Sequence, residues 1–341
     1  MWITSSLDTV RIPTRVALGN FDGVHRGHRR VIEPILDSPA VVELGVKPNG
    51  YRNGALHGGS VDEAIAPGVQ QPHSTVLTFR PHPQEFFTGQ QRQLLTPLDE
   101  KVVCLRDMGV QQLVLLPFDQ TLAEMSAQDF VEIILVQRLR VQEISVGQDF
   151  RFGCKRSGTT EDLKAIAAAY GVAVQIIPLH TSNGERISSS AIRQALQSGD
   201  LAQANHLLGR PYTLMGEVVH GQQLGRLLGF PTANLKLPTE KFLPHRGVYS
   251  VRVSGSALTP SGGSVAGVMN IGNRPTVDGV KQTIEVHLLD WSGDLYGQTL
   301  TVSLEKFIRP EQKFASLDAL KAQIQADCEM ARSLLAITPL P

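Results

Sequence analysis

The chain has 341 residues, 42% hydrophobic and 19% charged, a composition typical of a globular protein that is large enough for two domains. Basic and acidic residues balance at 32 each, so there is no net positive field of the kind that gathers nucleic acid. The chain has no apolar run of the roughly 18 residues that span a membrane, no secretory signal pattern and no metal spacing among its three cysteines. We therefore expect a cytoplasmic protein with neither nucleic acid nor membrane as partner.

The first half of the chain alternates short β-rich runs with helical patterns. In chain order these segments are RVALGNF, VIEPILD, STVLTFR, KVVCLRDMG, QLVLLPF, AQDFVEIILVQRL and EISVGQDF. Such alternation is typical of βαβ units, in which helices cover a parallel sheet. It predicts an α/β, Rossmann-like domain over residues 1–186, with ligands at the carboxyl ends of the strands.

Residues 38–74 interrupt this alternation. The segment is rich in Gly, Pro, Asn and His and has little periodicity, which predicts a long loop or flexible insertion. Its histidines His57 and His73 have no neighbours at ligand spacing, so a solvated loop accounts for them better than a metal site does.

Helical spacing returns over residues 187–209, where Gly199 interrupts the run and predicts two short helices that link the domains. The positions expected to be buried there are Ile192, Leu196, Leu201 and Leu207.

Residues 210–341 have a different sequence pattern. Closely spaced β-runs without intervening helices predict a small antiparallel barrel of the Greek-key type. A C-terminal helix follows, with Ser316 as its expected cap. Its apolar positions at near-helical spacing are Leu317, Leu320, Ile324, Ala331 and Leu335.

A turn rich in glycine and histidine follows the first strand and opens a helix, with the sequence GNFDGVHRGHRRVI over residues 19–32. Its glycines allow the backbone to approach a ligand closely, and a helix N-terminus favours phosphate. His25 and His28 lie three residues apart on the first helical turn and could donate hydrogen bonds to charge that develops on phosphorus. The alternative is a glycine-rich turn whose histidines satisfy only local hydrogen bonds. The flanking arginines Arg26, Arg29 and Arg30 favour the phosphate site.

The segment ISSSAIR, over residues 187–193, offers a second group of phosphate donors. Ser189 and Ser190 supply hydroxyls at a helix start, and Arg193 lies one turn further on. An N-cap serine with a surface arginine is the alternative interpretation.

The second half contains GEVVHGQQLGRLLGFPTANL over residues 216–235, in which glycines recur between two strands. Such spacing is also common in turns. Thr232 and Asn234, however, provide oxygen ligands suited to Mg²⁺ bound to nucleotide phosphate. Further on, QTIEVHLLD places Glu285 and His287 on one face of a strand, opposite its apolar residues. Glu285 is either a surface ion-pair partner or the base that accepts a proton from an alcohol.

These motifs resemble the prokaryotic bifunctional riboflavin kinase/FMN adenylyltransferase family, also called FAD synthetase. In the first half the resemblance lies in HxGH, TFRPHP, VGQDFRFGCKRSG and ISSSAIR, in that order. In the second half it lies in LLGRPY, GFPTAN, GVYSVRV, MNIGNRPTV, IEVHLLD and FIRPEQKF. The resemblance implies a nucleotidyltransferase domain at residues 1–186 and a riboflavin kinase domain at residues 210–341. It also implies riboflavin, FMN and ATP as substrates and Mg²⁺ as cofactor.

The resemblance assigns residues to both reactions. For adenylyl transfer it implies catalytic contacts from His25 and His28, and phosphate contacts from Gly19, Asn20, Phe21, Asp22, Gly23, Ser189, Ser190 and Arg193. For the kinase it implies Glu285 as catalytic base, Gly225, Arg226, Gly229, Thr232 and Asn234 at ATP, Thr232 and Asn234 at Mg²⁺, and Arg309 and Asn273 at the flavin. The family usually has Thr at the position of Ser190, and serine keeps the hydroxyl.

Two other functions stay open from the sequence. One is a nucleotidyltransferase of the HxGH type with a single activity and a passive barrel, and the other is a flavin-binding regulator without turnover. The oligomeric state also stays open, a weak homo-oligomer included.

Overall fold

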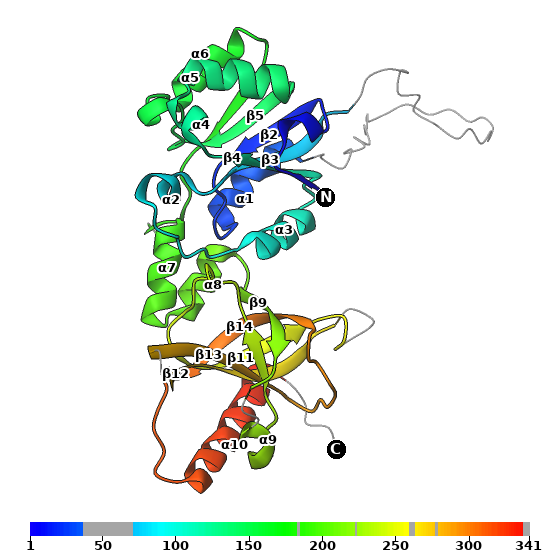
Figure 1. The fold of residues 1–341 in the computed structure, drawn as a ribbon, viewed down its shortest axis with the longest axis vertical. Helices are drawn as coiled ribbons and strands as arrows, with labels where there is room; N and C mark the ends of the chain where they lie inside the picture. Colours follow the sequence, from blue (N-terminus) through cyan, green and yellow to red (C-terminus); the bar gives the residue numbers. More distant parts are fainter. Residues whose placement is uncertain (37–70, 183–184, 222–223, 259–262, 277–278, 337–341) are drawn as a thin grey trace, which may run out of the picture. The chain divides into compact units, whose positions relative to one another are not determined.

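The computed structural model describes residues 1–36, 71–182, 185–221, 224–258, 263–276 and 279–336 (Figure 1). The insertion expected over residues 38–74 therefore lies outside the described residues, apart from its last four. Contacts divide the chain into two compact units. One comprises residues 1–19, 32–78 and 109–176, and the other residues 20–31, 79–108 and 177–341.

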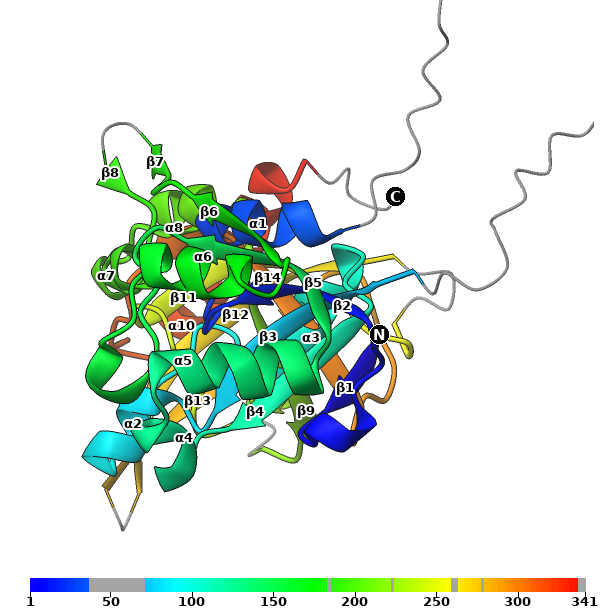
Figure 2. The same cartoon turned by 90° about the horizontal axis from the view of Figure 1, so that it is seen from above.

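The first unit is built on a six-stranded sheet with the order β1-β4-β3-β2-β5-β6. The strands are β1 (Trp2–Thr4), β2 (Thr14–Leu18), β3 (His73–Arg80), β4 (Gln112–Pro117), β5 (Val141–Gly147) and β6 (Ala173–Ile177). In the middle of the sheet β2 runs parallel to β3 and to β5, which lies beside it in Figure 2. The strands β2 and β3 are buried over most of their length, as expected for parallel strands that are covered on both faces of the sheet. The predicted α/β domain with a parallel sheet is confirmed.

Short helices connect these strands, and several begin at a side-chain cap. The helix α6, for example, opens with a capping box in which Thr159 and Asp162 bond reciprocally. The helices are η1 (Leu7–Thr9), η2 (Glu33–Ile35), α4 (Gln120–Glu124), α5 (Ala127–Asp129), η3 (Phe130–Arg138), η4 (Cys154–Arg156) and α6 (Thr160–Ala168).

The second unit contains the remaining helices and a closed barrel. Before the barrel come α1 (Arg26–Ile32), α2 (Pro83–Thr88), α3 (Leu98–Asp107), the hairpin of β7 (Thr181–Ser182) and β8 (Glu185–Arg186), α7 (Ser189–Ser198) and α8 (Leu201–Leu208). The two expected linking helices are thus α7 and α8. All four positions predicted to be buried in them are buried.

The barrel has the strand order β10-β13-β12-β11-β14-β9, with antiparallel pairs. Its elements are β9 (Tyr212–Val219), α9 (Leu224–Leu228), β10 (Ala233–Lys236), β11 (Gly247–Ser254), β12 (Val265–Thr276), β13 (Gly279–Leu288) and β14 (Thr299–Arg309). Although β10 and β11 are consecutive in the chain, they are not neighbours in the barrel. This crossover fits the predicted barrel of the Greek-key type.

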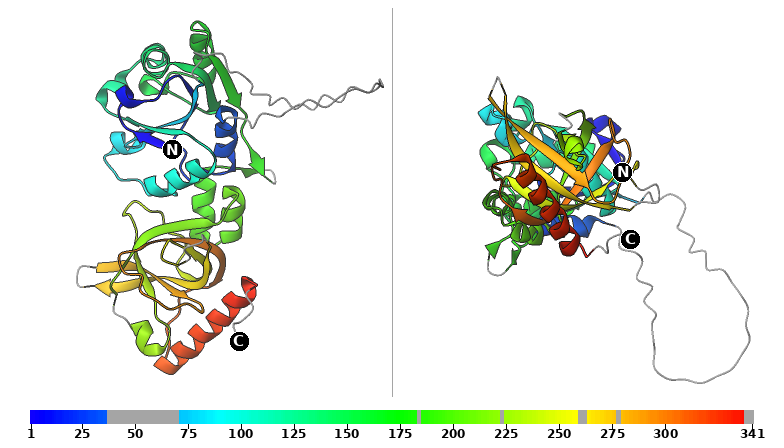
Figure 3. Two further views of the ribbon diagram at one scale, coloured as in Figure 1. Left: turned by 90° about the vertical axis from the view of Figure 1, so that its right-hand side faces the viewer. Right: turned by 90° about the horizontal axis from the view of Figure 1, so that it is seen from below.

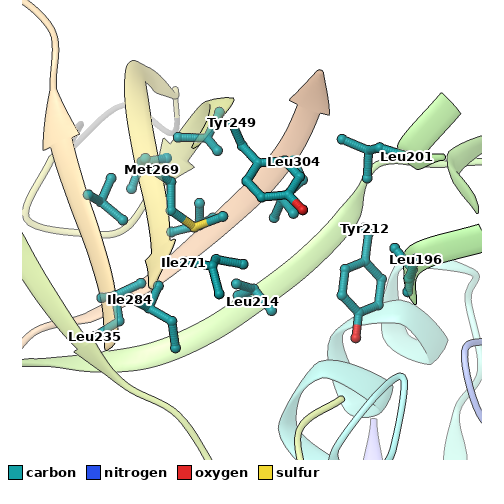
Figure 4. Close-up of a cluster of buried hydrophobic side chains, with 14 of the residues drawn as sticks. Leu196, Leu201, Tyr212, Leu214, Leu235, Tyr249, Met269, Ile271, Ile284 and Leu304 are labelled. Atoms are coloured by element: carbon teal, nitrogen blue, oxygen red, sulfur yellow. The ribbon is translucent and has the colours of Figure 1, made fainter. Parts of the chain in front are cut away.

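One apolar core fills the barrel and continues to α7 and α8 (Figure 4). Alternate residues of each strand point inward, such as Leu214 on β9, Met269 on β12 and Ile284 on β13. Leu196 and Leu201 join the same core from the two linking helices. The linking helices therefore pack on the barrel as part of one folded body.

The C-terminal helix α10 (Leu317–Leu334) lies along the outside of the barrel (Figure 3). Ser316 caps it, as expected. Of the apolar positions at near-helical spacing, Ala331 and Leu335 are buried against the barrel, whereas Leu317 is 69% exposed. The buried residues of the helix, from Asp327 onward, all lie in its second half.

Candidate functional site

The turn predicted to bind phosphate runs from the end of β2 to the start of α1. The N–H of Gly19 donates to the backbone oxygen of Leu77 (3.2 Å) and so continues the sheet by one bond. Phe21 is buried, and its ring meets His28 edge-on at a centroid distance of 5.4 Å. Phe21 therefore packs within the turn, and its predicted contact with ATP stays a prediction.

The carboxylate of Asp22 anchors the turn. It is 4% exposed and accepts hydrogen bonds from the backbone N–H groups of Leu95 (2.8 Å) and Thr96 (3.2 Å). The next residue, Gly23, has φ +92°, where a side chain would be strained, and its N–H donates to Thr96 Oγ1 (2.9 Å). The carboxylate of Asp22 is thus occupied by the protein's own donors, and its role toward phosphate stays a prediction.

The two histidines stack on each other with their ring centroids 3.6 Å apart. His25 Nδ1 accepts from the N–H of His28 (3.2 Å), which leaves the ring proton of His25 on Nε2. Burial lowers the pKa of His25 to about 4, and burial with the adjacent His25 lowers the pKa of His28 well below 6.5. Both rings are neutral at pH 7, and each offers one N–H donor. In the described part of the chain, the buried His28 Nδ1 has no hydrogen-bond partner, and its contact with a phosphate stays a prediction.

The helix α7 brings the second predicted group of phosphate donors to the same turn. Ser188 caps the helix, and Ser189 Oγ donates to the backbone oxygen of Asp22 (2.7 Å). Ser190 is exposed. Arg193, 171 residues from Asp22, forms a largely buried ion pair with that carboxylate. The structure therefore joins the two motifs, through a pair that the sequence did not reveal.

Two cations that sequence reasoning missed hold the carbonyl groups of the turn. Lys101 Nζ donates to the backbone oxygen of Asn20 (2.8 Å). Arg210 donates to the backbone oxygens of Gly23 (2.9 Å) and Val24 (3.2 Å). Arg210 stands in the motif LLGRPY, but a contact between that motif and the turn has no signature in the sequence.

The second candidate site is a row of residues across the barrel. Glu285 on β13 is the direct partner of Asn234 on β10 and of Asn270 on β12. The row continues from Asn270 to Val248 on β11 and from Val248 to Arg309 on β14. Direct partners in antiparallel strands project from the same face with Cβ atoms about 5 Å apart. One face thus presents Asn234, Glu285 and Asn270 side by side.

This row lies on the outer face of the barrel. Ile284 and Val286 belong to the interior core, so Glu285 and His287 project outward, as the alternation predicted. The ring of His287 is fixed by a 2.8 Å hydrogen bond between its Nδ1 and the backbone oxygen of Pro231. The strand glutamate is therefore placed beside the segment that contains the predicted Mg²⁺ ligands.

Glycines of the segment before β10 lie directly against these polar side chains. A Cβ on Gly221 would lie 2.3 Å from Asn234 Nδ2. A Cβ on Gly225 would lie 2.3 Å from the backbone oxygen of Phe230 and 3.3 Å from Thr232 Oγ1. The glycines are required because the backbone passes within contact distance of the amide and the hydroxyl.

The donors gathered here fit a hard cation. Thr232 and Asn234 contribute a hydroxyl and an amide, and Glu285 contributes a carboxylate in register, which are the oxygen ligands that Mg²⁺ prefers. Arg226 is exposed on α9, and Gly229 has φ +89° at the end of that helix. Their predicted contacts with ATP stay predictions.

Arg309, predicted at the flavin, is held by the C-terminal helix. Its Nε and Nη2 donate to the carboxylate of Asp327 at 2.9 and 2.7 Å, and Gln323 donates to the same carboxylate (2.9 Å). Asp327 is 3% exposed. This bidentate pair anchors α10 to β14, and the flavin contact of Arg309 stays a prediction.

Asn273, the other predicted flavin contact, is exposed near the end of β12. It stands three residues after Asn270, so the strand alternation directs its side chain to the opposite face from Asn270 and Glu285. The structure therefore does not bring Asn273 into the polar row, and its flavin role stays a prediction.

Comparisons with known proteins cover both halves. Residues 208–335 match the riboflavin kinase family, and residues 8–44 and 62–191 match the FAD synthetase family. The bifunctional riboflavin kinase/FMN adenylyltransferase of Escherichia coli K12 is 41% identical over 324 residues, which cover 95% of this chain and 93% of that protein. The protein of the same name from Listeria monocytogenes is 34% identical, covering 94% and 92% of the two chains.

A solved structure from Streptococcus pneumoniae, titled as a macrolide-efflux protein, is 29% identical and superposes with a TM-score of 0.77. The match covers 97% of this chain and 98% of that one. Within the residues that the structure describes, no helix combines the length and apolar character needed to cross a membrane. With both family matches and relatives above 30% identity over nearly the whole length, the chain belongs to the family of bifunctional riboflavin kinase/FMN adenylyltransferases.

Proposed function

We propose that the polar row of the barrel phosphorylates riboflavin to FMN and that the histidine turn transfers the adenylyl group of ATP to FMN, which gives FAD and pyrophosphate. The register that pairs Glu285 with Asn234 is the observation that carries the proposal, because it sets a carboxylate beside the predicted ligands of Mg²⁺ and ATP.

The kinase reaction needs a base. The ribityl hydroxyl of riboflavin is a poor nucleophile, and Glu285 is the carboxylate that accepts its proton as the γ-phosphoryl group is transferred. Thr232 and Asn234 would hold Mg²⁺, which neutralises charge on the ATP phosphates when it is bound.

Adenylyl transfer needs no base. The second pKa of a phosphate monoester is about 6, so FMN attacks the α-phosphorus of ATP as an anion. His25 and His28, neutral and each with an N–H donor, stabilise charge on the phosphate oxygens, and Ser189 and Arg193 fix the neighbouring helix start.

The protein uses riboflavin, FMN and ATP as its small-molecule substrates, and Mg²⁺ is its metal. All three cysteines, Cys104, Cys154 and Cys328, are free, which favours a reducing compartment such as the cytoplasm.

The test incubates the purified chain with riboflavin, ATP and Mg²⁺ and separates the flavins by chromatography. FMN should form first and FAD should follow. Glu285→Ala should form no FMN yet convert supplied FMN to FAD, and His28→Ala should stop at FMN. Without FMN production the chain would be the nucleotidyltransferase with a passive barrel, and without either product it would be a flavin-binding protein.

A further inference from the structure

A buried lysine of the barrel lies outside the proposed kinase row. Lys241, between β10 and β11, is 2% exposed, and its ammonium lies 4.3 Å above the ring of Tyr212. Its Nζ donates to the carboxylate of Glu100 on α3 (2.6 Å) and to the backbone oxygen of Leu95 (2.7 Å). A residue of the predicted kinase domain is therefore bound both to α3 and to the chain segment that precedes it.

The partner carboxylate is also fixed by the barrel. Glu100 is 4% exposed and accepts from the N–H of Met215 (3.2 Å) and from Thr213 Oγ1 (3.4 Å), both on β9. Burial lowers the pKa of Lys241 and raises the pKa of Glu100. Desolvation offsets much of the attraction within a buried ion pair. Such a pair therefore stabilises the fold little more than two apolar side chains in its place would.

Residues 93–96, which we call the strap, connect this pair to the histidine turn. On one side of the strap, the N–H of Leu94 donates to the backbone oxygen of Glu240 (2.6 Å), and Leu94 accepts from the N–H of Phe242 (2.8 Å). On the other side, the N–H groups of Leu95 and Thr96 donate to the carboxylate of Asp22. The strap thus lies between the barrel segment that contains Lys241 and the turn that contains the histidines.

Asp22 connects the strap to the second phosphate motif, the segment ISSSAIR. One carboxylate oxygen accepts from the strap, and the other is paired with Arg193 of α7. Arg193 also donates to the backbone oxygen of Gln93 in the strap (2.9 Å). Moving the strap would therefore shift both the histidine turn and the start of α7.

We propose that Lys241 and Glu100 are positioning residues for adenylyl transfer, although Lys241 belongs to the kinase domain. This inference rests on the proposed function of the histidine turn. Lys241 holds the strap through Leu95, and the strap holds Asp22 at the spacing that aligns the histidines with Arg193. Misplacement of reacting groups by 1 Å costs on the order of 10²-fold in rate, so a buried cation outside the barrel row can govern the other reaction.

The test compares Lys241→Met, Glu100→Gln and the double variant with Lys236→Met, the same substitution at an exposed lysine of β10. Adenylyl transfer is assayed with supplied FMN and varied ATP, and kinase activity is assayed with riboflavin in the same preparations. Lys241→Met should lower kcat/KM for ATP in adenylyl transfer by about 10²-fold, with kinase activity within about twofold of wild type. Lys236→Met should change neither.

The double variant separates positioning from stability. It contains no unpaired buried charge, so its Tm should recover above that of either single variant. Its adenylyl transfer should stay low, because Leu95 still lacks a donor at its carbonyl. Recovery of adenylyl transfer together with Tm, or equal loss of both activities in folded Lys241→Met, would overturn the inference. Normal adenylyl transfer in Lys241→Met refutes only the inference, whereas a wild-type chain that makes no FAD refutes the proposed function itself.

Discussion

Substitution of Gly221 by alanine should disable the kinase reaction selectively. The added Cβ would lie 2.3 Å from Nδ2, 2.5 Å from Cγ and 2.7 Å from Oδ1 of Asn234. Ordinary contact begins at 3.4 Å, so the amide must move by about 1 Å or rotate away. Since Asn234 is the direct cross-strand partner of Glu285, either movement separates the predicted metal ligand from the base.

The magnitude follows from this displacement. A shift of 1 Å in a reacting group costs on the order of 10²-fold in rate, which corresponds to about 2.7 kcal/mol in the activation barrier. We therefore expect kcat for FMN formation to fall about 10²-fold in Gly221→Ala. Adenylyl transfer to supplied FMN should stay at the wild-type rate, because the atoms nearest to a Cβ on Gly221 belong to Asn234 of the other proposed site.

The assay follows FMN formation from riboflavin and ATP by chromatography, with adenylyl transfer as the internal control. Gly297→Ala is the matched substitution, because an added Cβ there meets open space and its φ of +73° costs only about 1–2 kcal/mol of backbone strain. A folded Gly221→Ala chain that makes FMN at the wild-type rate would show that Asn234 is not needed where we place it.

Two further predictions concern acid and the C-terminal helix. Folding lowers the pKa of His25 from 6.5 to about 4, so the unfolded chain binds the proton more readily than the folded chain does. The contribution of His25 to the free energy of unfolding is therefore fully present above pH 6.5 and is lost as the pH falls toward 4. Between pH 7 and pH 5, the free energy of unfolding of the unit that contains His25, measured with urea, should fall by about 2 kcal/mol more in the wild-type chain than in His25→Gln. Equal decreases in the two proteins would refute this prediction. Asp327→Asn should lower the free energy of unfolding of the barrel by about 3–5 kcal/mol, because Arg309 loses its buried partner. The more exposed pair of Arg332 and Asp290 is the control: Asp290→Asn should cost less than about 1 kcal/mol, and similar losses in both variants would contradict the anchoring role.

The sequence predicted those parts of the fold that depend on local patterns. Alternating apolar runs and helical spacing indicated the parallel sheet, and closely spaced β-runs indicated the barrel. The two-residue alternation in QTIEVHLLD placed Glu285 and His287 on one face, which the register confirms. Such features are readable because a strand or helix repeats its burial pattern along the chain.

Contacts between distant segments could not be read in the same way. The pairing of Asp22 with Arg193 joins residues 171 apart, and each of the two looked like a phosphate contact in isolation. Lys241 and Glu100 are 141 residues apart, in segments that showed no motif. A buried ion pair depends on which surfaces meet in the folded chain, and single-sequence periodicity contains no information about that meeting.

We propose that the chain contains two separate phosphate-transfer sites, one with a carboxylate base and one without. Mixing Glu285→Ala with His28→Ala and supplying riboflavin, ATP and Mg²⁺ tests whether the sites are separate. Neither variant alone should make FAD from riboflavin, whereas the mixture should, because FMN released by His28→Ala is a substrate for Glu285→Ala. A mixture of folded variants that forms no FAD would contradict the account.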